Sequence, residues 1–193
     1  MGKKSERKKQ FIRETARKVF IEKGYKNVTM KDVVEACEIS RGGLYLYYGS
    51  TTELFLDVLQ MEAQDTDDAF SEAVVNNASP ADILALFLQE QKKELLRKED
   101  TLAVATYEFA FDREKPDKEN YLLRQFQEAV LIIEHLITEG VRVGEFVCDD
   151  PHAAARNIMY VIEGLKISAH TMGVTEQTVD EEMRYLMQRL TNG

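Results

Sequence analysis

Tryptophan is missing from this 193-residue sequence, and cysteine, histidine and proline are scarce, with two, three and three residues. Cys37 and Cys148 stand in different segments, and neither belongs to a metal-ligand spacing, which argues against a disulfide framework and against a zinc site. The three histidines are equally dispersed. The sequence therefore predicts no metal and no cofactor.

Catalytic and phosphate-binding motifs are also missing: there is no P-loop, no G-x-G-x-x-G and no G-x-S-x-G. The longest apolar runs, such as "AVLIIEHLI" at 129–137, fall well short of the roughly 18 residues of a membrane span. No apolar segment follows the N-terminal "MGKKSERKKQ" that would make it a secretion signal. We expect a cytoplasmic protein with no membrane partner and no enzymatic activity.

Charge of the two signs is unevenly distributed. Residues 1–50 hold 12 Lys and Arg against 6 Asp and Glu, a net +6, and the remaining 143 residues hold 13 against 28, a net −15, which together give the −9 of the chain. Such asymmetry indicates a polyanion-binding end on an acidic body. A merely solvated, lysine-rich tail stays the alternative for Lys3 to Lys9.

Most of the sequence shows the apolar spacing and the capping residues of helices. "FIRETARKVF" at 11–20 places apolar residues on one stripe, and Gly24 offers a stop. Thr29 with Asp32 predicts a capped short helix. Ser40 predicts a second cap, before a helix in which Leu44 and Tyr48 pack inward.

The stretch "SRGGLYLYYGS" at 40–50 also fits a glycine turn followed by an aromatic strand, but its neighbours favour a helix. Gly42 and Gly43 each cost a helix up to about 1 kcal/mol relative to alanine. A helix without side chains in its first turn lets its backbone approach another surface closely. A helix, a tight turn and a short helix on a basic segment describe a helix-turn-helix that enters the DNA major groove.

The acidic remainder predicts further helices, bounded by strong cap signals. Ser50 with Glu53 starts a helix that runs to about residue 75, Ser79 precedes Pro80 at the next start, and Asp150 precedes Pro151 at another. Thr178 with Glu181 caps the last. The expected ranges after residue 75 are 80–98, 101–112, 117–139, 151–172 and 179–190.

Residues 11–55 contain five short motifs that are specific only in combination. They are A-x-x-x-F (Ala16, Phe20), G-Y (Gly24, Tyr25), T-x-x-D-V (Thr29, Asp32, Val33), S-R-G-x-L-Y-x-Y (Ser40, Arg41, Gly42, Leu44, Tyr45, Tyr47) and E-L (Glu53, Leu54). In these motifs the segment resembles the DNA-binding domain of the TetR family of bacterial transcriptional regulators. The resemblance implies an all-α protein with an N-terminal three-helix DNA-binding domain at 1–50 and a C-terminal helical ligand-binding and dimerisation domain at 51–193.

The resemblance also implies which residues meet DNA, through phosphates, base edges or a thymine methyl. These residues are Thr29, Ser40, Arg41, Gly42, Gly43, Tyr45, Leu46, Tyr47, Ser50 and Thr51. The sequence departs from the family in two places. Gly49, Ser50 and Thr51 stand where the family commonly has Pro-Ser-Lys, so the usual phosphate-binding lysine is absent. Leu46 stands where the family often has a polar ring, and it cannot read a base by a hydrogen bond.

The implied function is a ligand-responsive regulator, most simply a repressor that a small organic effector releases from an inverted-repeat operator. A DNA-compacting protein is the second reading and an all-helical enzyme a distant third. The residues that we expect to bind the effector are Phe87, Tyr107, Glu108, Phe111, Phe126, Met159 and Glu163. Among them, Glu108 would suit a cationic ligand. We expect a homodimer through the two C-terminal helices, by stripes of Ile158, Val161, Ile162, Leu165 and Ala169 and of Met183, Leu186, Met187 and Leu190.

Overall fold

The computed structural model describes residues 3–75, 78–97, 99–112 and 121–191, and all regular structure in these ranges is helical. The all-α prediction is confirmed. Contacts divide the chain into two compact units, Met1–Ala69 with Asp100–Lys115, and Phe70–Glu99 with Pro116–Gly193. These units follow packing rather than function, and the expected functional division after residue 50 stays a prediction.

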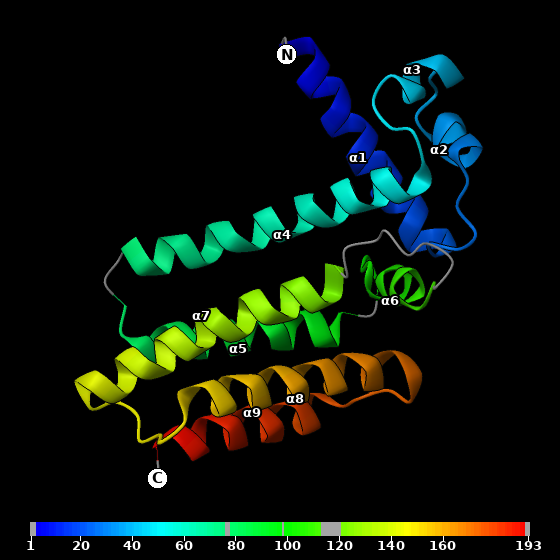
Figure 1. Ribbon diagram of the computed structural model, residues 1–193. Helices are drawn as coiled ribbons and strands as arrows, with labels where there is room; N and C mark the ends of the chain where they lie inside the picture. Colours follow the sequence, from blue (N-terminus) through cyan, green and yellow to red (C-terminus); the bar gives the residue numbers. More distant parts are fainter. Residues whose placement is uncertain (1–2, 76–77, 98, 113–120, 192–193) are drawn as a thin grey trace. The chain divides into compact units, whose positions relative to one another are not determined.

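The first unit contains the predicted helix-turn-helix (Figure 1). Its helices are α1 (Lys3–Lys23), α2 (Met30–Ala36), α3 (Arg41–Tyr45), the N-terminal part of α4 (Thr51–Val75) and α6 (Ala103–Phe111). The start of α1 at Lys3 lies well before the apolar stripe that predicts this helix. Lysine, arginine, glutamate and glutamine are good helix formers, so the charged residues before Phe11 continue the helix instead of forming a separate tail.

Aromatic rings form the core of the first unit. The rings of Phe20 and Phe55 are 4.6 Å apart between centroids, and Tyr25 lies 5.1 Å from Phe55. Phe109 of α6 joins them, with its centroid 4.9 Å from that of Tyr25. Ring pairs at these separations contribute beyond the apolar area that they bury. The sequence motif G-Y at Gly24 and Tyr25 is therefore a packing feature, which holds α6 against the helix-turn-helix.

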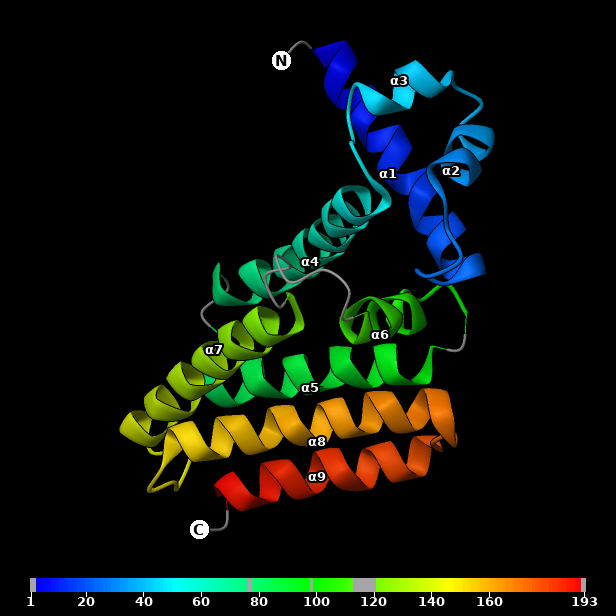
Figure 2. The ribbon, with the colours of Figure 1, turned by 45° about the vertical axis from the view of Figure 1, so that its right-hand side comes forward.

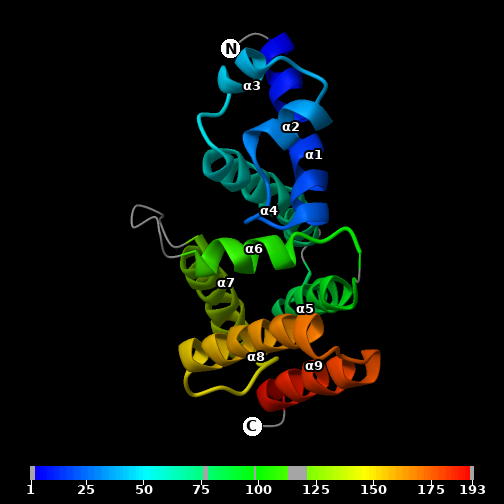
Figure 3. The same ribbon diagram turned by 90° about the vertical axis from the view of Figure 1, so that its right-hand side faces the viewer.

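The second unit is a helical bundle that surrounds its own apolar core (Figures 2 and 3). Its helices are α5 (Pro80–Leu96), α7 (Tyr121–Val143), α8 (Pro151–Thr171) and α9 (Glu176–Thr191). α7 packs mainly along α8, and α5 contacts α7, α8 and α9. The predicted starts at Pro80 and Pro151 are confirmed, because Ser79 and Asp150 accept hydrogen bonds from the N–H groups of Asp82 and Ala153.

Two expectations for the last helices are wrong. α9 begins at Glu176 and not at 179, because Thr175 accepts the N–H of Thr178 and so takes the capping role assigned to Thr178 with Glu181. The stripes expected to form the dimer contact are instead largely core of the second unit, since these helices first bury their apolar faces against α5 and α7. The buried members of the stripes are Ile158, Ile162, Leu165, Met183, Leu186 and Leu190.

No helix in the described ranges combines the length and apolar character needed to cross a bilayer.

Candidate nucleic-acid interface

Apolar anchors fix α2 and α3 on α1. Val33 and Leu44 are fully buried, and Tyr48 is 2% exposed, as the sequence predicts for the inward side of the short helix. Between the two helices the chain reverses at Glu38, which adopts a positive φ of 52°. Leu44 is the buried residue of α3, so the rest of this short helix is available for a partner.

The outward side of α3 brings together most of the residues that the resemblance assigns to DNA. Arg41 and Gly42 are exposed, and Tyr45 and Leu46 are exposed by 43% and 83%. The guanidinium of Arg41 lies 5.4 Å from the centre of the Tyr45 ring, a cation–π separation that supports both side chains at the surface. Arg41 presents a positive charge on this side of α3, and Leu46 presents an apolar side chain.

The two adjacent glycines face different surroundings. A Cβ built on Gly42 would meet nothing within 4 Å, whereas one on Gly43 would lie 3.1 Å from the Ser40 hydroxyl and 4.0 Å from the ammonium of Lys8. Ser40 needs that room, because its Oγ accepts the N–H of Gly43 at 3.1 Å and caps α3. The Ser40 cap therefore explains why position 43 lacks a side chain. No atom of the protein within 4 Å would exclude a side chain at position 42.

Thr29 is exposed at the start of α2, but its polar groups are engaged within the chain. Its hydroxyl and its N–H both donate to Asp32, at 2.5 and 2.7 Å, while its Oγ1 accepts the N–H of Asp32. Lys23, 2.7 Å from the same carboxylate, together with these bonds from Thr29, holds the pKa of Asp32 well below its usual range. The capping box is confirmed, and the phosphate contact of Thr29 stays a prediction.

Ser50 and Thr51 begin α4. Ser50 Oγ accepts the N–H of Glu53 at 3.1 Å, and the Glu53 carboxylate accepts the N–H of Gly49 at 2.7 Å, one residue earlier than in a standard capping box. The hydroxyl proton of Ser50 is not used in this cap. Thr51 is half-buried in the first turn.

A polar network ties the interface to the body of the first unit. The Tyr48 hydroxyl donates to Asp57 at 2.5 Å, and Lys9 and Arg13 lie 2.9 and 3.6 Å from the same carboxylate. Burial and the bond to Asp57 raise the pKa of the Tyr48 phenol. Burial opposes ionisation of Asp57 too, but the bonds from Tyr48 and Lys9 outweigh it and hold the pKa of Asp57 below its usual range. Asp57 therefore remains an anion that fixes three side chains.

Two α1 residues that the sequence reasoning left out of the interface lie beside α3. The Lys8 ammonium lies 4.0 Å from the position that a Cβ on Gly43 would take, and the Ser5 hydroxyl donates to the Tyr47 hydroxyl over 3.5 Å. Helical spacing could have predicted this position. Ser5 and Lys8 precede the buried Ile12 by seven and four residues, which puts all three on nearly the same side of the helix.

The seven predicted effector residues are divided between the two units. Tyr107, Glu108 and Phe111 belong to α6 in the first unit, where the carboxylate of Glu108 accepts the N–H of Lys26 at 3.1 Å and would collide with any side chain at Gly24. Phe111 is 68% exposed. The other four lie in the second unit, and three of them, Phe87, Phe126 and Met159, belong to or pack against one apolar core.

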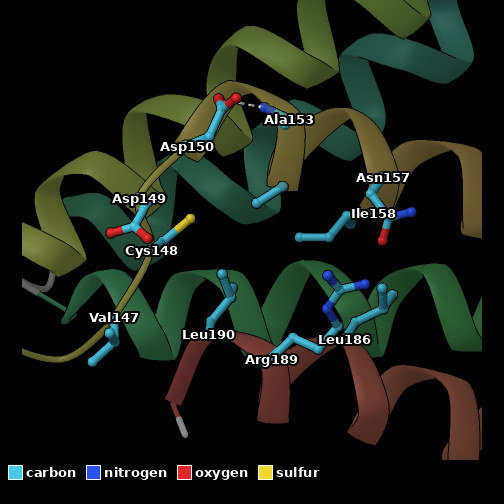
Figure 4. A pocket seen from close by; sticks show the side chains of 11 residues that line it. Val147, Cys148, Asp149, Asp150, Ala153, Asn157, Ile158, Leu186, Arg189 and Leu190 are labelled. Carbon is cyan, nitrogen blue, oxygen red and sulfur yellow. Dashed lines mark hydrogen bonds between the residues drawn. The ribbon is translucent and has the colours of Figure 1, made fainter. Parts of the chain in front are cut away.

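Glu163, the remaining residue, lies 3.1 Å from Lys166 on α8. A cavity of about 430 Å³ in the second unit is lined by none of the seven. It lies among the α7–α8 loop, α8 and α9, with Arg189 and Asn157 beside the apolar Ile158 and Leu186, and Asp150 turned to cap Ala153 (Figure 4). The effector assignment of the seven residues stays a prediction.

Comparison with known proteins gives a family for both parts of the chain. Residues 12–58 match the family described as bacterial regulatory proteins, tetR family, and residues 83–180 match the tetracyclin repressor-like C-terminal domain. The chain is 32% identical over 136 residues to the uncharacterized HTH-type transcriptional regulator YfiR of Bacillus subtilis, which covers 70% of this chain and 66% of that protein.

A second relative and a solved structure agree with this result. The HTH-type transcriptional regulator QacR of Staphylococcus aureus is 22% identical over 163 residues, 84% of this chain and 86% of that protein. A TetR transcription regulator from Haloarcula marismortui, 20% identical, superposes with a TM-score of 0.81 over 94% of this chain and 97% of its own. At this identity the superposition shows the fold.

A helix-turn-helix in one unit and a helical bundle in the other define a DNA-binding transcriptional regulator. The chain belongs to the tetR family of bacterial regulatory proteins. Regulators of this family bind DNA, typically form dimers and typically respond to small molecules.

Proposed function

We propose that this protein is a repressor that binds an inverted-repeat operator as a homodimer and leaves it when a small organic molecule binds. The observation that carries the proposal is the outward side of α3, where Gly42 has free space around it while Arg41, Tyr45 and Leu46 are exposed. A helix that is anchored on one side and bare on the other is suited to lie in a major groove. A protein of this function acts in the cytoplasm, where bacterial DNA lies.

The outward faces of α8 and α9 are the surface we assign to the dimer, in place of the buried stripes. One face of α8 carries residues at i, i+3, i+7 and i+10, namely Asn157, Tyr160, Gly164 and Ile167. The side chains of Tyr160 and Ile167 are 62% and 46% exposed. A Cβ on Gly164 would meet nothing within 4 Å, so the backbone of a partner helix has room to approach there. Tyr185, 58% exposed on α9, would extend the same surface.

For the effector we favour the four predicted residues of the second unit. The ring of Phe126 lies 4.9 Å from that of Tyr160, and Phe87 is half-buried on α5. Aromatic side chains beside an apolar core, with one carboxylate at Glu163, suit an organic molecule with an apolar body. Tyr107, Glu108 and Phe111 lie on α6 in the first unit and are left out of this proposed site.

The test is a screen of small organic molecules against the complex of the protein with an operator selected from random duplexes. We expect at least one compound class to weaken operator binding by about 5- to 150-fold, the usual scale of coupling between two sites. A regulator should also prefer its operator over random DNA by at least about 10³. A protein with strong operator preference and no responsive compound would be a constitutive repressor, and one without preference would be a compacting protein.

A further inference from the structure

Positive charge is distributed unusually in the DNA-binding unit. After Arg41 the chain contains no lysine, arginine or histidine until Lys92, so neither the C-terminal part of the interface nor α4 supplies a cation. DNA binding draws most of its affinity from cations that neutralise phosphates. The cations of this interface must therefore come from Arg41 and from the residues before it.

The first turns of α1 carry such cations. Residues 3–9 hold five basic residues and one acid, Glu6. Lys9 is committed to Asp57, but in the part of the chain that the structure describes no carboxylate pairs with Lys4, Arg7 or Lys8, and all three are exposed. Free charge is thus concentrated on the part of α1 that precedes its buried stripe.

These turns lie beside the recognition helix α3, as two views of the ribbon show (Figures 1 and 2). The Lys8 ammonium is 4.0 Å from the position of a Gly43 Cβ, and Ser5 donates to the hydroxyl of Tyr47, which the resemblance assigns to a phosphate. Lys4 precedes Lys8 by four residues and so lies on the same side of α1. The cations therefore extend the α3 surface instead of pointing away from it.

We propose that Lys8, assisted by Lys4, binds a DNA phosphate next to α3 and replaces the lysine that related regulators carry at the start of α4. Ser5 positions the Tyr47 hydroxyl for a neighbouring phosphate. The proposal rests on the DNA-binding function of the family, and it adds the N-terminal turns of α1 to the interface. Because phosphate contacts carry no base information, these residues strengthen binding to every sequence alike.

Salt titrations of the full-length protein on operator and random duplexes test this assignment, with Lys8→Ala compared with wild type. Loss of one neutralised phosphate makes the negative slope of log K against log salt shallower by about 0.9 per subunit, on both DNAs. Lys18→Ala is the matched control, since Lys18 is exposed on the same helix but lies about 15 Å farther along its axis. The control should keep the wild-type slope, and Lys8→Arg should keep it as well.

A rescue variant separates a lost phosphate contact from a damaged fold. In the Lys8→Ala background, Thr51→Lys returns a cation to the first turn of α4 and should restore the slope on both DNAs. An unchanged slope in Lys8→Ala, or a loss confined to the operator, overturns the proposal. Failure of the wild type to bind any DNA would instead contradict the regulator function. The circular dichroism spectrum of Lys8→Ala should match that of the wild type, because alanine is a strong helix former.

Discussion

Each side chain at the interface either stabilises the fold or is exposed for contact with DNA. Ser40, Thr29 and Asp32 are capping residues by their hydrogen bonds, and this was predictable because capping acts over three residues of sequence. The network around Asp57 was not predictable, since Lys9 and Arg13 reach it from another helix. Gly42 is the residue that no contact within the protein requires.

Gly42→Ala separates folding from DNA binding. The added methyl group has free space in the protein, so the free energy of unfolding should stay constant or rise by up to about 1 kcal/mol from better helix propensity. Against DNA the methyl group enters a close-packed contact, which costs about 1–3 kcal/mol and weakens operator binding at least about fivefold. Thermal melting and a binding isotherm measure the two effects; unchanged affinity would show that DNA does not approach this backbone.

Asp57 makes the stability of the first unit depend on pH. Its pKa lies below that of an unfolded aspartate, about 3.9, so the carboxylate stabilises the fold above that pH and the contribution is lost as pH falls through the folded pKa. Asp57→Asn should therefore destabilise the protein at pH 7 by about 1–3 kcal/mol. The difference from wild type should narrow below about pH 4.

Urea unfolding at pH 7 and pH 3 measures this difference, and the exposed Asp149→Asn is the control, with little effect at either pH. A difference between Asp57→Asn and wild type that is equal at both pH values would rule out the network as the source of the acid sensitivity.

Elements are the scale at which the sequence was most informative, because apolar spacing and caps identify a helix locally. Every helix of the described ranges overlaps an expected segment, including α5 after Ser79 and α8 after Asp150. α7 continues to Val143, beyond the expected end at 139, and its expected start at 117 lies outside the described residues. Where a helix ends, and which other helices it packs against, depends on tertiary contacts. The sequence could not indicate that α6 packs its Phe109 against Tyr25, or that the apolar stripes of α8 and α9 turn toward their own core.

Gly140 shows how such a contact constrains one element. It lies inside α7, where a Cβ would come within 2.2 Å of the buried ring of Phe146. Gly140→Ala should lower the free energy of unfolding by about 1–3 kcal/mol, since overpacking outweighs the gain in helix propensity. The control Thr138→Ala, exposed on the same helix, should shift it by less than about 0.5 kcal/mol in chemical denaturation. Equal effects would mean that the Phe146 ring moves aside freely.

The whole molecule combines a basic DNA-binding end with an acidic body, and its proposed action requires two copies. Residues 1–50 carry a net +6 within a chain of net −9. Two chains joined through the outward faces of α8 and α9 would present two recognition helices to one duplex. The sequence assigned the dimer contact to apolar stripes of α8 and α9 that are largely buried in the second unit, because apolar periodicity does not distinguish an intrachain partner from a second subunit.

Gly164→Arg tests the proposed dimer surface. A guanidinium at this position would block the close approach of a partner helix and lose hydration without a counter-charge, so dimer dissociation should become on the order of tenfold easier or more. Sedimentation velocity over a concentration series measures the change. Ala85→Arg, at an exposed small residue of α5, adds the same side chain elsewhere in the second unit and should leave the dimer intact. Equal dimerisation of both variants would exclude the α8 face.

Selection of bound fragments from random duplex DNA by the purified protein tests the central claim most directly. We predict a selected sequence with two-fold symmetry, whose half-sites lie about one helical turn, roughly 34 Å, apart or farther, because two identical recognition helices read one duplex. Binding to the selected sequence should exceed binding to random DNA by at least about 10³. Selected fragments with no dyad, bound no more tightly than random DNA, would contradict it.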